Sequence, residues 1–167
     1  MNLVGSTAPE ALRVHVSDAL QAVDVLPRGA RVVDLGSGAG FPGIPLALAR
    51  PDLQLTLVEI RERRVAFLRH VERELGAGFE VRRARIEDGP APGDAYAFAL
   101  MRAVAPLDRA LPLARPWVGE EGEIWVWTRE AASQTLEVAG GLAGHIELGT
   151  RGRVLRVRAA AVPRGTR

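Results

Sequence analysis

Apolar residues recur at helical spacing near the beginning of the chain. Thr7 and Glu10 have the spacing of a capping box, and Pro9 lies in the first turn, which is typical of a helix start. Apolar side chains then follow three or four positions apart, at Leu12, Val16, Leu20 and Val23. This pattern predicts a helix over residues 9–25.

Beyond residue 29, β-branched and apolar stretches alternate with stretches of helical periodicity. The pattern predicts strands over 31–35, 53–59, 79–85, 95–101 and 123–128, and helices over 41–50, 61–75, 106–115 and 130–143. Strands that alternate with helices form a parallel sheet with helices on both faces. Two last strands, within 145–150 and 153–162, flank Arg151-Gly152 and predict an antiparallel hairpin at the sheet edge. The predicted fold class is α/β, with a mostly parallel seven-stranded sheet.

A glycine-rich turn follows the first strand. Gly36, Gly38 and Gly40 lie between Asp34, at the end of the strand, and the next helix. Glycine allows positive φ and lets a ligand approach the backbone, and a helix start supplies unpaired N–H groups. The Asp34 carboxylate suits a ligand with amino or hydroxyl donors and would repel a pyrophosphate. The turn therefore predicts a nucleotide-binding corner, and the alternative is a tight crossover turn that binds nothing.

The turn departs from the dinucleotide fingerprint, because Phe41 stands where G-x-G-x-x-G needs its last glycine. A nicotinamide cofactor is therefore disfavoured. A second acid, Glu59, ends the next strand, and the two features together resemble the site of class I S-adenosylmethionine-dependent methyltransferases, whose fold is Rossmann-like. That resemblance implies that Glu59 binds the two ribose hydroxyls and that the glycines admit the methionine end of the cofactor.

Composition changes this picture little. A length of 167 residues suffices for one domain with a sizeable core, and 47% hydrophobic and 25% charged residues are ordinary globular values. No segment approaches the roughly 18 unbroken apolar residues of a membrane helix. The N-terminus lacks the basic and apolar regions of a signal peptide, and the chain has no cysteine. We therefore expect one cytoplasmic domain.

Arginine supplies all 22 basic residues, beside a net charge of only +2. One cluster precedes Ile86 and contains Arg82, Arg83 and Arg85. Another has no acid and covers the end of the chain, with Arg151, Arg153, Arg156, Arg158, Arg164 and Arg167. Such clusters suit a phosphate backbone, although codon preference and a solvated chain end would produce them as well.

Several reaction types are excluded by what the sequence lacks. Without cysteine, the covalent route to pyrimidine carbons is closed, because it requires a thiolate adduct. The Asp/Asn-Pro-Pro-Tyr/Phe loop used on exocyclic amines is absent, since Leu100-Met101-Arg102-Ala103 stands after the fourth strand. His15, His70 and His145 are scattered, so we expect no metal site. An intrinsically nucleophilic target remains, such as a purine N7, whose lone pair attacks without first losing a proton.

Several motifs together resemble the RsmG (GidB) family. They are DLGSGAGFPGIPLA, LVEIRERRVAFLRHVERELG, RARIED and MRAVAPL, with Asn2-Leu3 and His15-x-x-Asp18 before them. The resemblance implies a class I fold and methylation of guanine N7 in the 530 loop of 16S ribosomal RNA, with S-adenosylmethionine as cofactor. It implies 16S ribosomal RNA or the small ribosomal subunit as partner, without membrane or metal. The oligomeric state is left open, with a monomer as the simplest expectation.

Site residues follow from the same resemblance. Gly36 and Phe41 would contact the cofactor, Ile86 and Glu87 would hold the adenine, and Arg102 would lie at the mouth of the site. An apolar Ile86 suits stacking on the adenine ring, and Arg102 suits the methionine carboxylate or the RNA. Arg102 is also the candidate catalytic residue. His15 and Asp18 share a helix face, and we interpret them as structural or RNA-facing.

Three departures from the family pattern bear on activity. The chain begins at the Asn-Leu motif, where the family carries a further helical segment, so we expect a single domain of an N-terminal helix region (1–28) and a catalytic core (29–167). Trp127-Thr128-Arg129 replaces Leu-Lys-Gly, and Ile60 replaces a serine. Two alternatives therefore stay open: a paralogue that uses the same cofactor on another RNA or a small molecule, and a cofactor-binding protein that has lost transfer activity.

Overall fold

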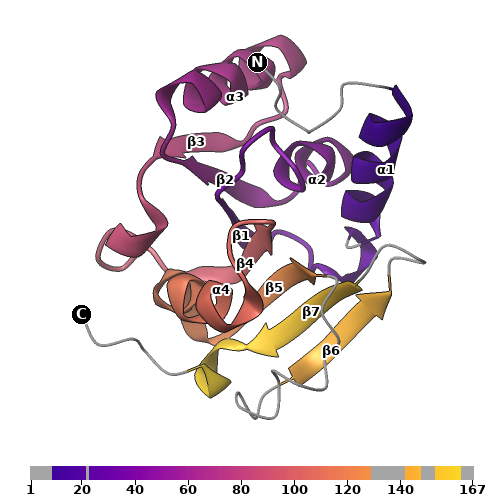
Figure 1. Ribbon diagram of the computed structural model, residues 1–167. Helices are drawn as coiled ribbons and strands as arrows, with labels where there is room; N and C mark the ends of the chain where they lie inside the picture. Colours follow the sequence, from indigo (N-terminus) through magenta and orange to yellow (C-terminus); the bar gives the residue numbers. More distant parts are fainter. Residues whose placement is uncertain (1–8, 22, 129–141, 148–152, 163–167) are drawn as a thin grey trace.

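One mixed sheet with helices on both faces forms the centre of the computed structural model (Figure 1). The structure describes residues 9–21, 23–128, 142–147 and 153–162. The strands are β1 (Arg31–Leu35), β2 (Gln54–Glu59), β3 (Glu80–Arg83), β4 (Tyr96–Arg102), β5 (Val118–Thr128), β6 (Leu142–Glu147) and β7 (Arg153–Arg158). The α-helices are α1 (Pro9–Leu20), α2 (Gly43–Ala49), α3 (Glu62–Leu75) and α4 (Leu107–Ala114), and single 3₁₀ turns cover Val23–Val25, Ile86–Asp88, Arg115–Trp117 and Ala159–Ala161.

The strand order of this seven-stranded sheet is β3-β2-β1-β4-β5-β7-β6. The first five strands are parallel to one another, whereas β7 is antiparallel to both β5 and β6. The chain moves outward from β1 to β3 and then returns to the other side of β1 through β4, which makes β1 and β4 a topological switch point. The predicted α/β class, the parallel sheet and the antiparallel edge hairpin are confirmed.

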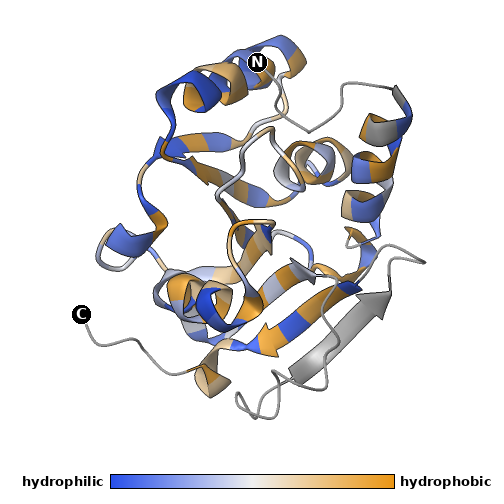
Figure 2. Ribbon diagram, in the orientation of Figure 1, coloured by the Kyte–Doolittle hydropathy of each residue, from blue (hydrophilic) through white to orange (hydrophobic). Residues whose placement is uncertain are grey.

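Side chains of the central strands alternate between two buried clusters, one on each face of the sheet. Val33 packs in one cluster with Leu111 of α4. Val32 packs in the other with Leu46 of α2 and Leu68 of α3. Figure 2 shows hydrophobic residues along the central strands and a mixture of hydrophilic and hydrophobic residues on α1 and α3. Burial on both faces explains why the parallel strands are continuous apolar runs in the sequence.

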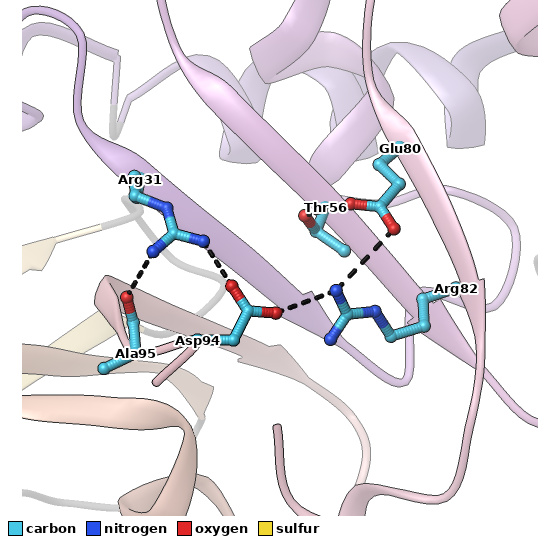
Figure 3. Close-up of polar contacts among 6 residues, drawn as sticks. All are labelled: Arg31, Thr56, Glu80, Arg82, Asp94 and Ala95. Carbon is cyan, nitrogen blue, oxygen red and sulfur yellow. Dashed lines mark hydrogen bonds and ion pairs between the residues drawn. The ribbon is translucent and has the colours of Figure 1, made fainter. Parts of the chain in front are cut away.

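A network of ion pairs ties β3 to the amino-terminal ends of β1 and β4 (Figure 3). The Arg31 guanidinium donates to the Asp94 carboxylate and to the Ala95 carbonyl, the latter at 2.9 Å. Arg82 of β3 donates to the other Asp94 oxygen at 2.8 Å and lies 3.7 Å from Glu80. The hydrogen bonds from Arg31 and then Arg82 lower the pKa of Asp94. The network thus connects the edge strand β3 to the central strands β1 and β4.

The first predicted helix is too long. α1 ends at Leu20 and a separate 3₁₀ turn covers Val23–Val25, whereas the prediction was one helix over 9–25. The backbone carbonyl of Asp18 accepts a hydrogen bond from the Trp127 indole N–H at 3.4 Å. This bond to β5 uses a carbonyl that a longer helix would pair with its own backbone. The contact thus joins the last turn of α1 to β5.

β5 begins at Val118 rather than at residue 123. The register changes along the strand, because Tyr96 pairs with Val118 and Phe98 pairs with Glu123. Gly122 lies in this irregular stretch, and a Cβ there would approach the Ala97 carbonyl oxygen to 2.5 Å. Residues 119–122 are glycines and acids, so the hydrophobic pattern does not predict that the strand includes them.

The predicted end of the chain needs two corrections. Leu142 and Ala143 belong to β6, so the predicted helix over 130–143 is wrong at its last two positions, and its remainder lies outside the described residues. β7 ends at Arg158 because a 3₁₀ turn follows over Ala159–Ala161, where the prediction extended the strand to 162. The predicted turn at 151–152 also lies outside the described residues.

Candidate functional site

A cavity of about 300 Å³ lies where β1 and β4 end side by side. Elements that are distant in the sequence meet around it: α1, the turn after β1, the first turn of α3 and the end of β4. The lining residues are His15, Gly36, Ser37, Gly38, Ala39, Phe41, Arg64, Arg102 and Ala103. Ligand sites of open α/β sheets lie at this position, outside the carboxyl ends of the strands at a switch point.

The glycine turn needs glycine for two different reasons. All three glycines have positive φ, at 73° for Gly36, 58° for Gly38 and 87° for Gly40. A Cβ on Gly36 would lie 2.8 Å from a Val104 methyl carbon, and one on Gly40 would lie 2.1 Å from Ile44. At Gly38 the nearest atom is an Arg64 nitrogen, at 3.6 Å, so this position has room. Gly36 and Gly40 are therefore closed by protein, and Gly38 offers its backbone to the cavity.

Asp34 lies beneath the turn and is not among the residues that line the cavity. Its side chain is buried, and Oδ2 accepts a hydrogen bond from the Gly43 N–H at 3.2 Å, at the start of α2. Oδ1 is buried without a hydrogen-bond partner. Burial raises the pKa of Asp34 to about 7, against the effects of the Ser37 side chain, the Gly43 N–H and the charge of Arg102. The structure thus gives Asp34 a contact with the helix start.

Glu59 joins the turn to the start of α3. One carboxylate oxygen accepts from the Gly38 N–H at 3.1 Å and lies 3.4 Å from Arg64, while the other accepts from the Arg61 N–H at 2.8 Å. The residue is only 5% exposed. Each carboxylate oxygen has two acceptor positions, so Oε2 is fully used and Oε1 can accept from one further donor, such as a hydroxyl group.

Arg102 ends β4 at the cavity and contacts two side chains of α1. Its Nη2 lies against His15 Nδ1, and it is 3.8 Å from the Asp18 carboxylate. The His15 ring also packs beside Phe41, with 5.4 Å between ring centroids. Burial lowers the pKa of Arg102, and the charge of Asp18 opposes this shift. Ala103, the next residue, has a φ of 53°, in the region that favours glycine.

Ile86 and Glu87 flank the turn without lining the cavity. Ile86 Cδ1 is 3.6 Å from the position that a Cβ on Gly36 would take, which places it beside the turn. Its carbonyl accepts a hydrogen bond from the Trp117 indole at 2.8 Å, which holds this short 3₁₀ turn against the core. Glu87 is exposed and lies 3.8 Å from Arg85.

The arginines of the first cluster are each paired with an acid. Arg82 binds Asp94, as described above. Arg83 lies 3.6 Å from Glu62, and Arg85 lies 3.8 Å from Glu87. These pairs reduce the net charge that the cluster presents to an RNA backbone.

The basic C-terminal stretch is described only in part. Arg156 forms two hydrogen bonds with Glu123, at 3.0 and 3.1 Å. Arg151, Arg164 and Arg167 lie outside the described residues. Within the described ranges, no group of three or more His, Cys, Asp or Glu side chains is placed to hold a metal ion, and no helix is long and apolar enough to span a membrane.

Five of the nine lining residues are not among the site residues that the sequence predicts, namely His15, Ser37, Ala39, Arg64 and Ala103. His15 was interpreted as structural or RNA-facing, although the His15-x-x-Asp18 spacing was noted. Arg64 had no assigned role. A usable signal existed for Arg64, because it lies in the first turn of the helix that follows Glu59, where a basic side chain can reach back to the strand end.

The rRNA small subunit methyltransferase G (GidB) family model matches residues 1–139 of the chain. Ribosomal RNA small subunit methyltransferase G of Mycobacterium avium (strain 104) is 41% identical over 126 residues, which cover 74% of this chain and 51% of the relative. Its counterpart in Corynebacterium jeikeium (strain K411) is 41% identical over 150 residues, which cover 84% of this chain and 67% of the relative. The chain thus spans about half the length of the first of these curated relatives.

The fold has a counterpart among solved structures. A crystal structure described as a SAM dependent methyltransferase from Aquifex aeolicus superposes with a TM-score of 0.68 at 18% sequence identity. The match covers 87% of this chain and 91% of that one. At this identity the likeness concerns the fold.

Proposed function

Because the chain belongs to the rRNA small subunit methyltransferase G (GidB) family, we propose that it transfers a methyl group from S-adenosylmethionine to N7 of a guanine in the 530 loop of 16S ribosomal RNA. The observation that carries the proposal is the cavity between the glycine turn and Arg102, at the switch point of the sheet. The partner is then 16S ribosomal RNA or the small subunit, and the place of action is the cytoplasm.

The residues around the cavity fit S-adenosylmethionine. Glu59 Oε1 keeps one acceptor position for a ribose hydroxyl, while Oε2 binds the backbone of Gly38 and the Arg64 side chain. The room above Gly38, and the ring of Phe41, suit the methionine end. Gly36 and Gly40 shape the turn that makes this room, and Asp34 supports it from below through the start of α2.

The adenine would lie beside the 3₁₀ turn over Ile86–Asp88. Ile86 offers an apolar side chain next to Gly36, and Glu87 offers a carboxylate that can accept from the exocyclic amine. Arg102 lines the cavity at the end of β4, where a guanidinium suits either the methionine carboxylate or an RNA phosphate.

The bound cofactor supplies an electrophilic methyl group on a sulfonium. A guanine N7 presents an in-plane lone pair, so no proton has to be removed before the methyl moves. The task of the chain is then to hold two reactants in line and to exclude water, and orientation supplies most of the rate. This reasoning favours a positioning role for Arg102 beside the reacting groups.

The test is methyl transfer from labelled S-adenosylmethionine to small ribosomal subunits and to free 16S ribosomal RNA, followed by mapping of the modified nucleotide. We expect one labelled guanine in the 530 loop, with modification at N7. Gly36→Arg should abolish the signal, because even a Cβ at this position would lie 2.8 Å from a Val104 methyl carbon and the turn would have to shift. Label at another nucleotide, or on a small molecule, would favour the paralogue and overturn the proposal.

Thr128 favours one other candidate, a cofactor-binding protein without transfer activity. It ends β5 directly after Trp127, the register partner of Arg102, at the position where the family pattern has lysine. Calorimetry separates the two candidates. Tight binding of S-adenosylmethionine without transfer to any ribosomal RNA, together with restored transfer in Thr128→Lys, would support a lost activity.

A further inference from the structure

Helix α1 lies over the ends of two neighbouring strands. Arg102 of β4 and Trp127 of β5 are direct register partners, and both contact the same turn of α1. The Trp127 indole donates to the Asp18 carbonyl at 3.4 Å, and the Asp18 carboxylate lies 3.8 Å from Arg102 Nη2. The indole hydrogen bond holds the last turn of α1 against the end of β5, next to the end of β4. It therefore helps to position His15 relative to Arg102.

The contact between Arg102 and His15 determines which tautomer His15 adopts. A guanidinium only donates hydrogen bonds, so His15 Nδ1 must be the acceptor of the contact with Arg102 Nη2. This requires the tautomer with its proton on Nε2. The ring packs beside Phe41 with a 53° angle between planes, which limits its rotation. Arg102 Nη2 is thus held from α1, by the neutral acceptor of His15 and by the negative charge of Asp18.

The exposure of Arg102 indicates what it can bind. Its side chain is 19% exposed, and the exposed part lies in the cavity that Gly36 and Gly38 also line. A carboxylate on a small ligand can enter such a cavity and pair with two of the five N–H donors of the guanidinium. A phosphate within an RNA strand is bulkier and would have to enter the same space.

We propose that His15 is a positioning residue: with Asp18, it orients the Arg102 guanidinium to bind the carboxylate of the amino-acid part of the cofactor. The proposal rests on the proposed function in one respect, since the ligand is S-adenosylmethionine or its demethylated product. Other charged groups near this site are Arg64 of α3, Glu59 of β2 and Asp34 of β1. They stay unchanged in the variants below.

The experiment compares two ligands that differ in the amino-acid part. S-adenosylhomocysteine carries the carboxylate, whereas 5′-methylthioadenosine lacks it. His15→Phe keeps a ring beside Phe41 and removes the acceptor, and His15→Asn keeps an acceptor near the position of Nδ1. His70→Asn on α3, where the histidine side chain is 62% exposed, is the matched control.

We expect His15→Phe to weaken the binding of S-adenosylhomocysteine about tenfold, which is the scale for losing the alignment of a charge-assisted hydrogen bond. The affinity for methylthioadenosine should stay within about twofold of the wild-type value. His15→Asn should restore binding of S-adenosylhomocysteine to within about threefold of the wild type, and His70→Asn should change neither ligand. Equal losses for the two ligands, or no loss for either, would overturn the proposal.

A second measurement does not depend on any ligand. Nitrogen-15 spectra of the imidazole rings report which ring nitrogen carries the proton. We expect an unprotonated Nδ1 for His15 in the wild type and a return to mixed tautomers in Arg102→Gln. A protonated Nδ1 in the wild type would contradict the contact. If the protein binds S-adenosylhomocysteine as expected yet methylates no RNA, the proposed function fails and this inference stands.

Discussion

Replacing Asp34 by asparagine should remove most of the pH dependence of stability that this carboxyl produces. The side chain is 1% exposed, one oxygen accepts from the Gly43 N–H, and the other has no hydrogen-bond partner. An ionised carboxylate in that place loses its hydration, and the contacts with Ser37 and Gly43 and the charge of Arg102 offset only part of that loss. Asparagine keeps an acceptor for Gly43 and carries no charge.

The magnitude follows from the pKa of Asp34, which burial raises from 3.8 to about 7. The folded protein therefore binds this proton more tightly than the unfolded chain does. The stabilisation is complete below about pH 3.8 and is lost as the pH rises through about 7. Its full size is about 4 kcal/mol, of which about 2 kcal/mol disappears between about pH 5.5 and about pH 8.5.

Urea unfolding at several pH values measures this loss. The wild type should lose about 2 kcal/mol of unfolding free energy across the window relative to Asp34→Asn. Asp88→Asn is the matched control, because Asp88 is exposed and should leave the slope of the wild type unchanged. The reasoning would be refuted by the same slope in wild type and Asp34→Asn. The amide of asparagine adds its own cost at every pH, so the slope is the quantity to compare.

Three further substitutions test the site and the sheet. Gly36→Arg should abolish S-adenosylmethionine binding in calorimetry while NAD binds neither protein, because even a Cβ there lies 2.8 Å from Val104. Glu59→Gln should weaken the cofactor by about 1 to 3 kcal/mol and also lower the melting temperature, since the carboxylate holds the turn; unchanged binding would place the ribose elsewhere. Glu123→Ala should cost about 1 to 3 kcal/mol in urea unfolding, because the Trp125 indole loses its 2.8 Å acceptor, and a smaller loss than about 0.5 kcal/mol would contradict this.

The order of the elements is predictable from the sequence because each central strand is buried on both faces. Such a strand is a short apolar run, bounded by turns, and its neighbours in the sequence are helices with one apolar side. The predicted strand over 31–35 matches β1, and the edge hairpin is confirmed. The start of β5 is not predictable in this way. Gly122 is required there because a Cβ would approach the Ala97 carbonyl oxygen, and a glycine adds nothing to a hydrophobic pattern.

The glycine turn and Glu59 are predictable because each is defined locally, by a strand end and the residues next to it, whereas Arg102 follows from the family resemblance. The side chains that these residues contact are not predictable in this way. His15 reaches Arg102 only because the sheet brings residues 87 positions apart together, and no local pattern records that distance. The sequence also does not show that the Glu59 carboxylate already binds two backbone N–H groups.

The arginine-rich composition illustrates why charge counts are weak evidence for an RNA surface. Arg82, Arg83 and Arg85 form a basic cluster in the sequence, yet in the structure each lies within 4 Å of an acid. Arg82 and Arg83 are neighbours in β3 and so point to opposite faces of the sheet, where each pairs with a different acid. Arg102 stands alone in the sequence, but the fold places it at the cavity beside the glycine turn. The position of one half-buried guanidinium at a switch point therefore says more about function than the total number of arginines.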